Sequence, residues 1–528
     1  MLPNVKECLK KTPDEVIGGM VTPFWKNHGK TCRRILWVSM LTCLFNYFYL
    51  IVSGYAGPDA ICEGVRYYIG ENTATGLARW FIPVVNNIFG KNVVIPLVVV
   101  VFYCLAMGVS AFLLFRLTGM ENSGFQILIT AAMVGFPVVT RQFAYLYTAL
   151  AYGLAFLWVV LAAWFLRQRK TVTFLAGTLC LLLMLGTYQA YIGAAAAVAI
   201  ICFMMDLIHE KKIAEALQNL LIYVGSGIIA GGLDLVIAKE MMKYRGIEAY
   251  DRVSSLSISD IVGNLGFTLR YSYKWFFDYF HSDVLSRNKL YLVLFVVLLA
   301  LIVAHTVILI QKKKVVPAIL MVLASLLLPL AMNVCVVIFP HNGIYDVMRY
   351  QYVLIIPLTF ALFGAFPRSI WGSMLQWLVY ADVFLLIVGY SISSNASAIC
   401  YKLAYESTHD QAAMMLSRVY ELDGYEPQAT PIVLGGGTIG YQDTYDSFGQ
   451  LFRYAVMESG PVFWGGEYGL TTCRYFYFID YLGVNPGWLT NEEYYAVIGT
   501  EEYAAMPTWP AEGSVGMVGD YAVIKIGE

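Results

Sequence analysis

Charged residues are scarce in this chain. Asp, Glu, Lys and Arg together make up 13% of its 528 residues, against about 25% in typical soluble domains. Hydrophobic residues make up 59%, and the mean hydropathy is +0.63. These values exclude an ordinary soluble domain, and repeated apolar runs of about 20 residues predict helices that span a membrane. We expect the lipid bilayer as a partner and no nucleic acid.

The sequence also lacks paired metal-binding cysteines. Its ten cysteines form no CxxC or CxxH pattern, so we expect no zinc site. We also expect no cleavable signal peptide, because residues 1–32 are polar and the apolar run after them is long enough to span a membrane.

The few charges are unevenly distributed along the chain. Residues 401–528 contain 17 acidic and 5 basic residues, whereas residues 1–34 contain seven Lys and Arg. Eleven apolar runs follow, at roughly 35–53, 92–115, 124–140, 143–166, 172–187, 190–208, 217–238, 289–310, 315–339, 351–366 and 370–392. Every connection on the same side as residues 1–34 contains Lys or Arg. The positive-inside rule therefore predicts a cytoplasmic N-terminus.

These patterns predict an all-α membrane protein of about 11 transmembrane helices. We expect a cytoplasmic segment at 1–34, a multi-span domain at 35–392, and a small extracytoplasmic α/β domain at 393–528. Within the last domain, 403–422 has the pattern of an amphipathic helix, and 431–434 and 521–526 have that of strands. The long connections 54–91 and 239–288 would face outward with this domain, so we expect the functional site on the outer side of the membrane.

The first long outer connection gathers charge in a protein that has little. Asp59, Glu63, Arg66 and Arg79 lie close together in the sequence. Pro58 can fix a turn and Asp59 can cap the following helix, which places Glu63 four residues later on the same face. Two carboxylates beside arginines are suited to proton abstraction from a sugar hydroxyl and to binding a phosphate. In the alternative interpretation Asp59 only caps, Glu63 pairs with Arg66, and Arg79 contacts lipid headgroups.

Other outward-facing cations are candidates for binding a phosphate. Arginine contacts phosphate oxygens through two parallel hydrogen bonds, and Arg141 and Arg349 join Arg79 in this group. Arg270 and Lys274 are four residues apart in the aromatic stretch 267–280, which is typical of a helix lying at the membrane interface. The alternative for each is a cation that reaches the headgroups without binding a substrate.

Polar side chains at two outer turns are candidates for substrate binding. Tyr188 and Gln189 lie between two apolar runs, and His341 and Asp346 lie in the next outer turn but one. Polar groups at membrane depth must be paired or must line a cavity. These residues either contact a sugar or satisfy the backbone of their own turns. Asp382 is the acid expected to stand alone inside an apolar run.

Several short motifs carry a resemblance to a known family. They are the acidic outer loop with Asp59 and Glu63, Ala78-Arg79-Trp80, Gly186-Thr-Tyr-Gln-Ala-Tyr191 and Met348-Arg349-Tyr350. Together with the layout of apolar runs over most of 30–400, they resemble the bacterial membrane glucosyltransferases of the O-antigen-modifying Gtr type II family. That family belongs to the GT-C-like class of glycosyltransferases, which use polyprenyl-phosphate sugars.

The resemblance implies a function and a location. The enzyme would transfer a sugar from a polyprenyl-phosphate donor to a cell-surface glycan such as O-antigen or a related polysaccharide. The resemblance implies that this sugar is glucose. The protein would lie in the bacterial plasma (inner) membrane, with its reaction on the outer face. The family's catalytic acid corresponds to Asp59, with Glu63 as the second carboxylate, and inversion at the anomeric carbon is implied. Relatives in the wider class show an adjacent acidic pair, whereas Ala60 follows Asp59 here. This departure leaves open which carboxylate is the base and whether a divalent cation, Mg²⁺ or Mn²⁺, takes part.

Two other functional classes fit part of the pattern. A lipid-linked-sugar flippase or other transporter also has many spans and cationic inner loops. Transporters usually show internal repeats with interrupted helices at matching positions, and this sequence shows no repeat. A non-catalytic scaffold with an acidic tail would not need carboxylates and arginines in a loop against the bilayer. The sequence therefore favours the glycosyltransferase.

Overall fold

The computed structural model describes most of the chain. The described residues are 13–53, 71–89, 94–248, 262–280, 288–338, 345–367, 369–436, 438–439, 451, 453–456, 463–464, 484, 487 and 489–527. Asp59, Glu63, Arg66 and His341 lie outside them.

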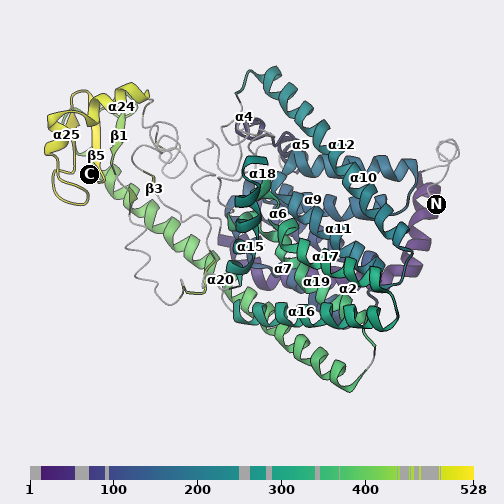
Figure 1. Cartoon of the computed structure of the whole chain (residues 1–528). Helices are drawn as coiled ribbons and strands as arrows, with labels where there is room; N and C mark the ends of the chain where they lie inside the picture. The colour runs from purple at the N-terminus through teal and green to yellow at the C-terminus, as the bar shows by residue number, and fades with distance from the viewer. Residues whose placement is uncertain are drawn as a thin grey trace.

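A bundle of apolar helices forms the bulk of the molecule (Figure 1). The long helices are α2 (Pro13–Ser53), α6 (Pro96–Thr118), α7 (Ser123–Gly135), α9 (Leu146–Leu166), α10 (Thr171–Thr187), α11 (Ile192–Ile208), α12 (Ile213–Arg245), α16 (Asn288–Gln311), α17 (Val315–Met332), α19 (Ile355–Ala365) and α20 (Ile370–Tyr420). Each predicted apolar run overlaps one of these helices. The core of the bundle includes buried residues from α6, α9 and α11.

Eight helices in the described part of the chain are long and apolar enough to cross a membrane. The number differs from the predicted eleven for a geometric reason. The stretch Ser123–Leu166 counts once, yet it contains two predicted runs, 124–140 and 143–166. Its first helix ends before Phe136, inside the first of these runs, where Pro137 starts the short helix α8 (Pro137–Gln142). Two further apolar helices, Thr171–Thr187 and Tyr350–Ala365, are shorter than the others. The predicted class, an all-α membrane protein, is confirmed.

The C-terminal region contains the predicted strands. β1 (Ile432–Gly435) pairs in parallel with β5 (Tyr521–Lys525), which pairs antiparallel with β4 (Val515–Val518). The helices α24 (Asn491–Ile498) and α25 (Glu501–Ala505) belong to the same region. The predicted helix at 403–422 is the end of α20, which continues without interruption across the predicted domain boundary at 393.

The outer connection 239–288 also contains helices. α12 extends into it as far as Arg245, and α15 (Leu265–Tyr279) covers the aromatic stretch. The helix expected there is confirmed. One face of α15 is buried through Thr268, Ser272, Phe276 and Tyr279, so this helix packs against the bundle.

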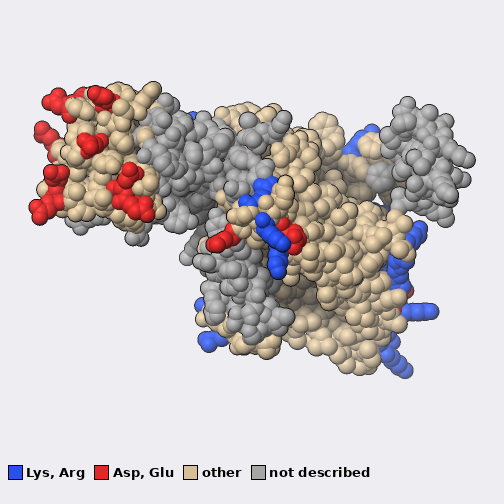
Figure 2. All heavy atoms as spheres, turned by 90° about the horizontal axis from the view of Figure 1, so that it is seen from above, with Lys and Arg blue, Asp and Glu red and all other residues tan. Residues whose placement is uncertain are grey.

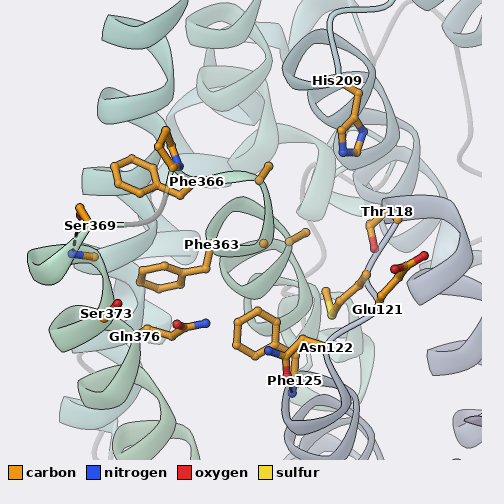
Figure 3. Close-up of a pocket in the computed structure, with 17 residues that line it drawn as sticks. Thr118, Glu121, Asn122, Phe125, His209, Phe363, Phe366, Ser369, Ser373 and Gln376 are labelled. Carbon is orange, nitrogen blue, oxygen red and sulfur yellow. Dashed lines mark hydrogen bonds between the residues drawn. The ribbon is translucent and has the colours of Figure 1, made fainter.

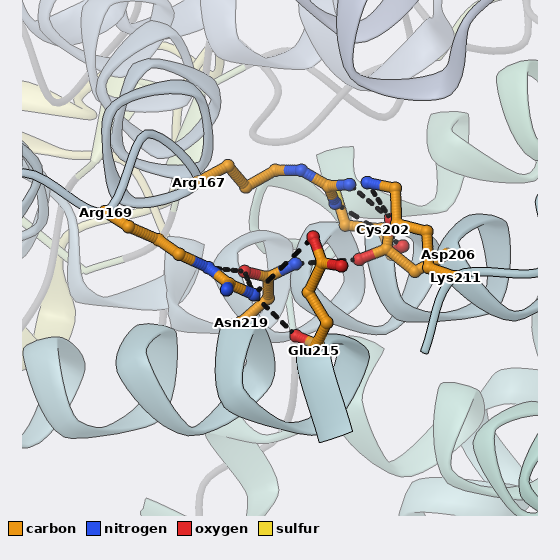
Figure 4. Close-up of polar contacts among 7 residues, drawn as sticks. All are labelled: Arg167, Arg169, Cys202, Asp206, Lys211, Glu215 and Asn219. Carbon is orange, nitrogen blue, oxygen red and sulfur yellow. Dashed lines mark hydrogen bonds and ion pairs between the residues drawn. The ribbon is translucent and has the colours of Figure 1, made fainter. Parts of the chain in front are cut away.

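The predicted inner connections meet at one end of the bundle, which we call the basic end. The connection after α11 contacts the one after α16, because Lys312 lies 2.8 Å from Glu210 and Lys314 also pairs with it. These two lysines lower the pKa of Glu210 to about 2. The connection after α9 contacts the start of α12 through Arg169 and Asn219 (Figure 4). Lys and Arg gather at this end in Figure 2, and the acidic surface lies on the C-terminal region.

Candidate active site

Two motifs far apart in the sequence form one unit at the end of the bundle away from the basic end. α4 (Glu71–Gly76) and α5 (Ile82–Phe89) are joined by a turn that contains Arg79. Its Ala78 has a φ of 57°. The Gln189 side-chain amide donates to Ala78 O at 2.8 Å, and Phe81 N donates to Gly186 O at 2.8 Å. The turn is therefore attached to the connection between α10 and α11. We call these two segments, residues 77–81 and 186–189, the Arg79 unit.

Trp80 is fixed on both sides. Its indole lies against Gly186, where an added Cβ would come within 2.3 Å of the ring. Glycine is needed here because no side chain fits between the connection and the indole. On the other side Trp80 Nε1 donates to Asp234 Oδ1 of α12 at 2.8 Å. The residue next to Arg79 is thus held by a close contact and by a hydrogen bond.

Arg79 is a half-buried cation beside two tyrosines. Its Nη1 donates to Tyr152 Oη at 3.3 Å, and its guanidinium carbon lies 5.1 Å from the centroid of the Tyr188 ring. The rings of Tyr152 and Tyr188 are themselves 4.2 Å apart. No carboxylate within the described ranges lies within ion-pair distance of Arg79. Aromatic faces stabilise a cation without neutralising its charge, so Arg79 is suited to binding an anion.

A second group of charges lies at the same end. Arg141 of α8 contacts Asp346 of the 3₁₀ helix η3 (Asp346–Met348), with Nη1 2.6 Å from Oδ2. Arg349 Nη1 lies 2.8 Å from the other oxygen, Oδ1. The Arg141 side chain is 5% exposed and that of Asp346 is 27% exposed. One carboxylate therefore bridges two arginines.

A buried polar chain connects the two groups. The rings of Tyr188 and Tyr191 are 5.4 Å apart. Gln142 Nε2 donates to Tyr191 Oη at 2.8 Å and to Val347 O at 3.2 Å, and its Oε1 accepts from Tyr103 Oη at 2.5 Å. Since Gln142 follows Arg141 and Val347 follows Asp346, the chain links the surroundings of Arg79 to the Arg141–Asp346 pair.

The structure therefore brings together six of the predicted site residues in two groups. Arg79, Tyr188 and Gln189 form the first, and Arg141, Asp346 and Arg349 form the second. Gln189 satisfies the backbone of the Arg79 turn, not that of its own turn. Tyr188 is 2% exposed and its ring lies beside the Arg79 guanidinium, so it supports Arg79, a role that neither alternative for Tyr188 included.

Arg270 and Lys274 do not join these groups through any contact seen in the described residues. Both are exposed on α15. Lys274 lies 3.9 Å from Asp278 and 5.8 Å from the centroid of the Tyr271 ring. This arrangement is that of a surface cation on an aromatic helix.

Three neighbours of the predicted residues were missed from the sequence. Tyr152 and Gln142 sit inside apolar or neutral stretches and give no local signal. Asp234 does give one, since a carboxylate inside an apolar run is unusual. The expectation that Asp382 stands alone is wrong, because Asp234 and Asp206 are also buried acids in apolar helices. Of the three acids Asp206, Asp234 and Asp382, only Asp234 contacts the Arg79 unit in the described structure.

A cavity of about 480 Å³ lies at the opposite end of the bundle (Figure 3). It is lined by residues that include Glu121, Asn122 and His209, and it belongs to the basic end. The cavity is therefore separate from the Arg79 unit. No cluster of metal-ligating side chains occurs among the residues that the structure describes.

Comparison with known proteins agrees with the family resemblance. The family model described as Glucosyl transferase GtrII matches residues 63–357, which is more than half of the chain. No curated protein and no solved structure matches this chain. The matched region contains Glu63 and both groups of site residues, the one around Arg79 and the one around Asp346. Asp59 lies just before it. The chain therefore belongs to the glucosyl transferase GtrII family.

Proposed function

We propose that this membrane glycosyltransferase moves glucose from a polyprenyl-phosphate donor to a cell-surface glycan such as O-antigen. The reaction takes place on the outer face of the bacterial plasma membrane. The observation that carries the proposal is the position of Arg79, which is half-buried and has no carboxylate partner in the described structure. It lies over the Tyr188 ring and donates a hydrogen bond to Tyr152 Oη. A lipid phosphate is an anion that reaches a bundle from the bilayer, and a guanidinium can contact two of its oxygens.

The two arginine groups have different roles in this proposal. Arg79 contacts the donor phosphate and stabilises the negative charge that grows on it as the bond to the sugar breaks. Arg141 and Arg349 already share Asp346, so their charge is partly neutralised. They fix Asp346, whose remaining exposure permits a hydrogen bond to the sugar.

The transfer itself needs a base. We assign this role to Asp59, with Glu63 orienting it or the acceptor. Asp59 takes the proton of an acceptor hydroxyl, and that oxygen forms a bond to the anomeric carbon. The bond from this carbon to the phosphate oxygen breaks, and the electron pair leaves with the lipid phosphate. Direct attack from the opposite side inverts the anomeric centre, as in a GT-C-type reaction.

The test is transfer of labelled glucose from purified polyprenyl-phosphate glucose in nanodiscs, with a lipopolysaccharide acceptor. Transfer by the wild-type protein supports the proposal. Movement of the donor across the membrane without formation of a glycosidic bond would instead support the transporter.

The topology gives a prediction that bears on this assignment. We expect Glu512→Cys, at an exposed position of the C-terminal region, to react with a membrane-impermeant thiol reagent in intact cells. Lys313→Cys, at the basic end, should react only after permeabilisation, because cationic connections stay cytoplasmic. The wild-type chain, which has ten cysteines, gives the background. The reverse pattern would place the Arg79 unit on the cytoplasmic side and overturn an outer-face reaction.

The Trp80–Asp234 hydrogen bond gives a second prediction. Asp234→Leu removes the acceptor of Trp80 Nε1, and one hydrogen bond contributes about 0.5–1.5 kcal/mol. We therefore expect a rise of about two- to tenfold in the KM for the donor, through a displaced Arg79, with a smaller change in kcat. Asp234→Asn keeps an acceptor oxygen and should restore the wild-type KM. Equal KM values in all three proteins would contradict a positioning role.

A further inference from the structure

The basic end contains a second hollow, formed where three connections meet. It has a volume of about 350 Å³ and is lined by Arg116, Leu117, Gly119, Trp164, Arg167, Gln168, Asp206, His209 and Lys211. Trp164 and Tyr152 lie on the same helix, α9, twelve residues apart, which corresponds to about 18 Å along the axis. The hollow is therefore distinct from the Arg79 unit.

Cationic side chains exceed carboxylates in this hollow by two. Arg116, Arg167 and Lys211 come from the ends of α6 and α9 and from the connection after α11, and Asp206 is the only carboxylate in the lining of the hollow. The positive-inside rule explains why such connections are basic. It does not explain why three cations from separate connections converge on one hollow.

Asp206 holds two of these cations in place. It is buried, with a side chain 2% exposed, and it pairs with Arg167 and lies 2.9 Å from Lys211 Nζ (Figure 4). Its second oxygen accepts from Asn219 Nδ2 at 3.0 Å. Arg167 also donates to Cys202 O at 3.5 Å. The two cations are thus ordered before any ligand arrives, which reduces the entropy lost on binding.

Arg116 supplies the charge that is not neutralised. It lies exposed in the last turn of α6, and no carboxylate of the described ranges forms an ion pair with it. His209 adds no further cation, because partial burial and the charge of Lys211 hold its pKa below the ordinary value. A neutral imidazole can still donate one hydrogen bond. Trp164 provides an apolar wall of the hollow, and indole rings are common where a membrane meets water.

We propose that this hollow binds a phosphate-bearing headgroup, with Arg116 as its principal contact. Basic pockets between helices on the cytoplasmic side are suited to anionic lipid headgroups. The volume is near the lower limit of roughly 300–1,000 Å³ for small-molecule sites, so it suits a headgroup and excludes a bulky glycan. The same chemistry would accept a small soluble phosphate ester.

The experiment measures lipid binding to the purified full-length protein by native mass spectrometry. Phosphatidylglycerol is compared with phosphatidylcholine of the same acyl chains, and glycerol 3-phosphate is the soluble probe. We expect Arg116→Gln to reduce the preference for phosphatidylglycerol about fivefold, the effect of one basic side chain near a lipid surface. Arg116→Lys should keep most of it.

Lys212→Gln is the matched control. It removes the same charge from the same end, is exposed, and lies next to Lys211 without lining the hollow. An unchanged preference in this variant, with a loss in Arg116→Gln, supports the site. Binding of glycerol 3-phosphate that depends on Arg116, without lipid preference, also supports it and identifies a soluble ligand. Equal losses in both variants, or no Arg116-dependent binding of either probe, would overturn the proposal. The readout needs no sugar transfer, so it is independent of the proposed function.

Discussion

Asp59→Asn should lower the turnover of glucose transfer by about 10²–10⁴-fold, the usual contribution of a general base. Asparagine keeps the size of the side chain and an oxygen that can cap a helix. The fold should therefore survive while the proton acceptor is lost. The loss should appear in kcat and not in donor binding, because the base acts on the acceptor hydroxyl in the transition state.

The controls separate catalysis from capping. Rates are measured at matched protein levels in nanodiscs with saturating donor, and donor affinity is measured separately. Glu63→Gln is the companion variant, and we expect a smaller loss because Glu63 only orients the base or the acceptor. If Asp59→Asn transfers glucose at the wild-type rate, Asp59 is a cap and not the base. A large loss in Glu63→Gln alone would then move the catalytic role to Glu63.

Arg79→Ala should weaken donor binding by about 10- to 150-fold, which corresponds to the 1.5–3 kcal/mol of a charge-assisted hydrogen bond. The guanidinium has aromatic partners and no carboxylate partner in the described structure. Its removal therefore deletes a ligand contact without leaving a buried acid unpaired. Arg79→Lys should also be impaired, since an ammonium lacks the planar pair of donors.

Arg270→Ala is the matched control for Arg79. It removes an arginine that is exposed on α15, so any general effect of charge on donor recruitment appears in both variants. The measurement is binding of polyprenyl-phosphate glucose to the purified protein, with thermal unfolding to confirm the fold. Arg79→Ala with unaltered donor affinity would mean that Arg79 contacts only headgroups. An equal loss in both variants would point to non-specific attraction.

The helices were predictable because each needs only a long apolar run. Continuity was not, and α20 shows why. Its hydropathy falls after residue 392, yet the sequence that follows contains helix-forming residues and no proline up to Tyr420. Hydropathy indicates where the chain leaves an apolar environment, whereas the end of a helix depends on propensity and capping. A boundary placed by hydropathy alone therefore falls inside a continuous helix.

The site was only half predictable, for a different reason. Arg349 and Asp346 are three residues apart, and their pairing follows from local geometry. Arg141 reaches the same carboxylate from α8, 205 positions away in the sequence, and no local pattern encodes such a contact. Gln189 shows a related limit. Its amide was expected to bind sugar or its own turn, but it supports the turn that presents Arg79.

The uninterrupted α20 gives the protein a mechanical property. A helix of 51 residues is about 75 Å long, and it leads from the bundle to the C-terminal sheet (Figure 1). Arg418 near its end donates to Pro510 O at 3.0 Å, and its guanidinium carbon lies 4.7 Å from the centroid of the Trp509 ring. The C-terminal region is therefore fixed to the end of α20. The sheet therefore cannot rotate relative to the bundle without bending α20. The length and stiffness of one helix thus fix the distance between the C-terminal sheet and the bundle.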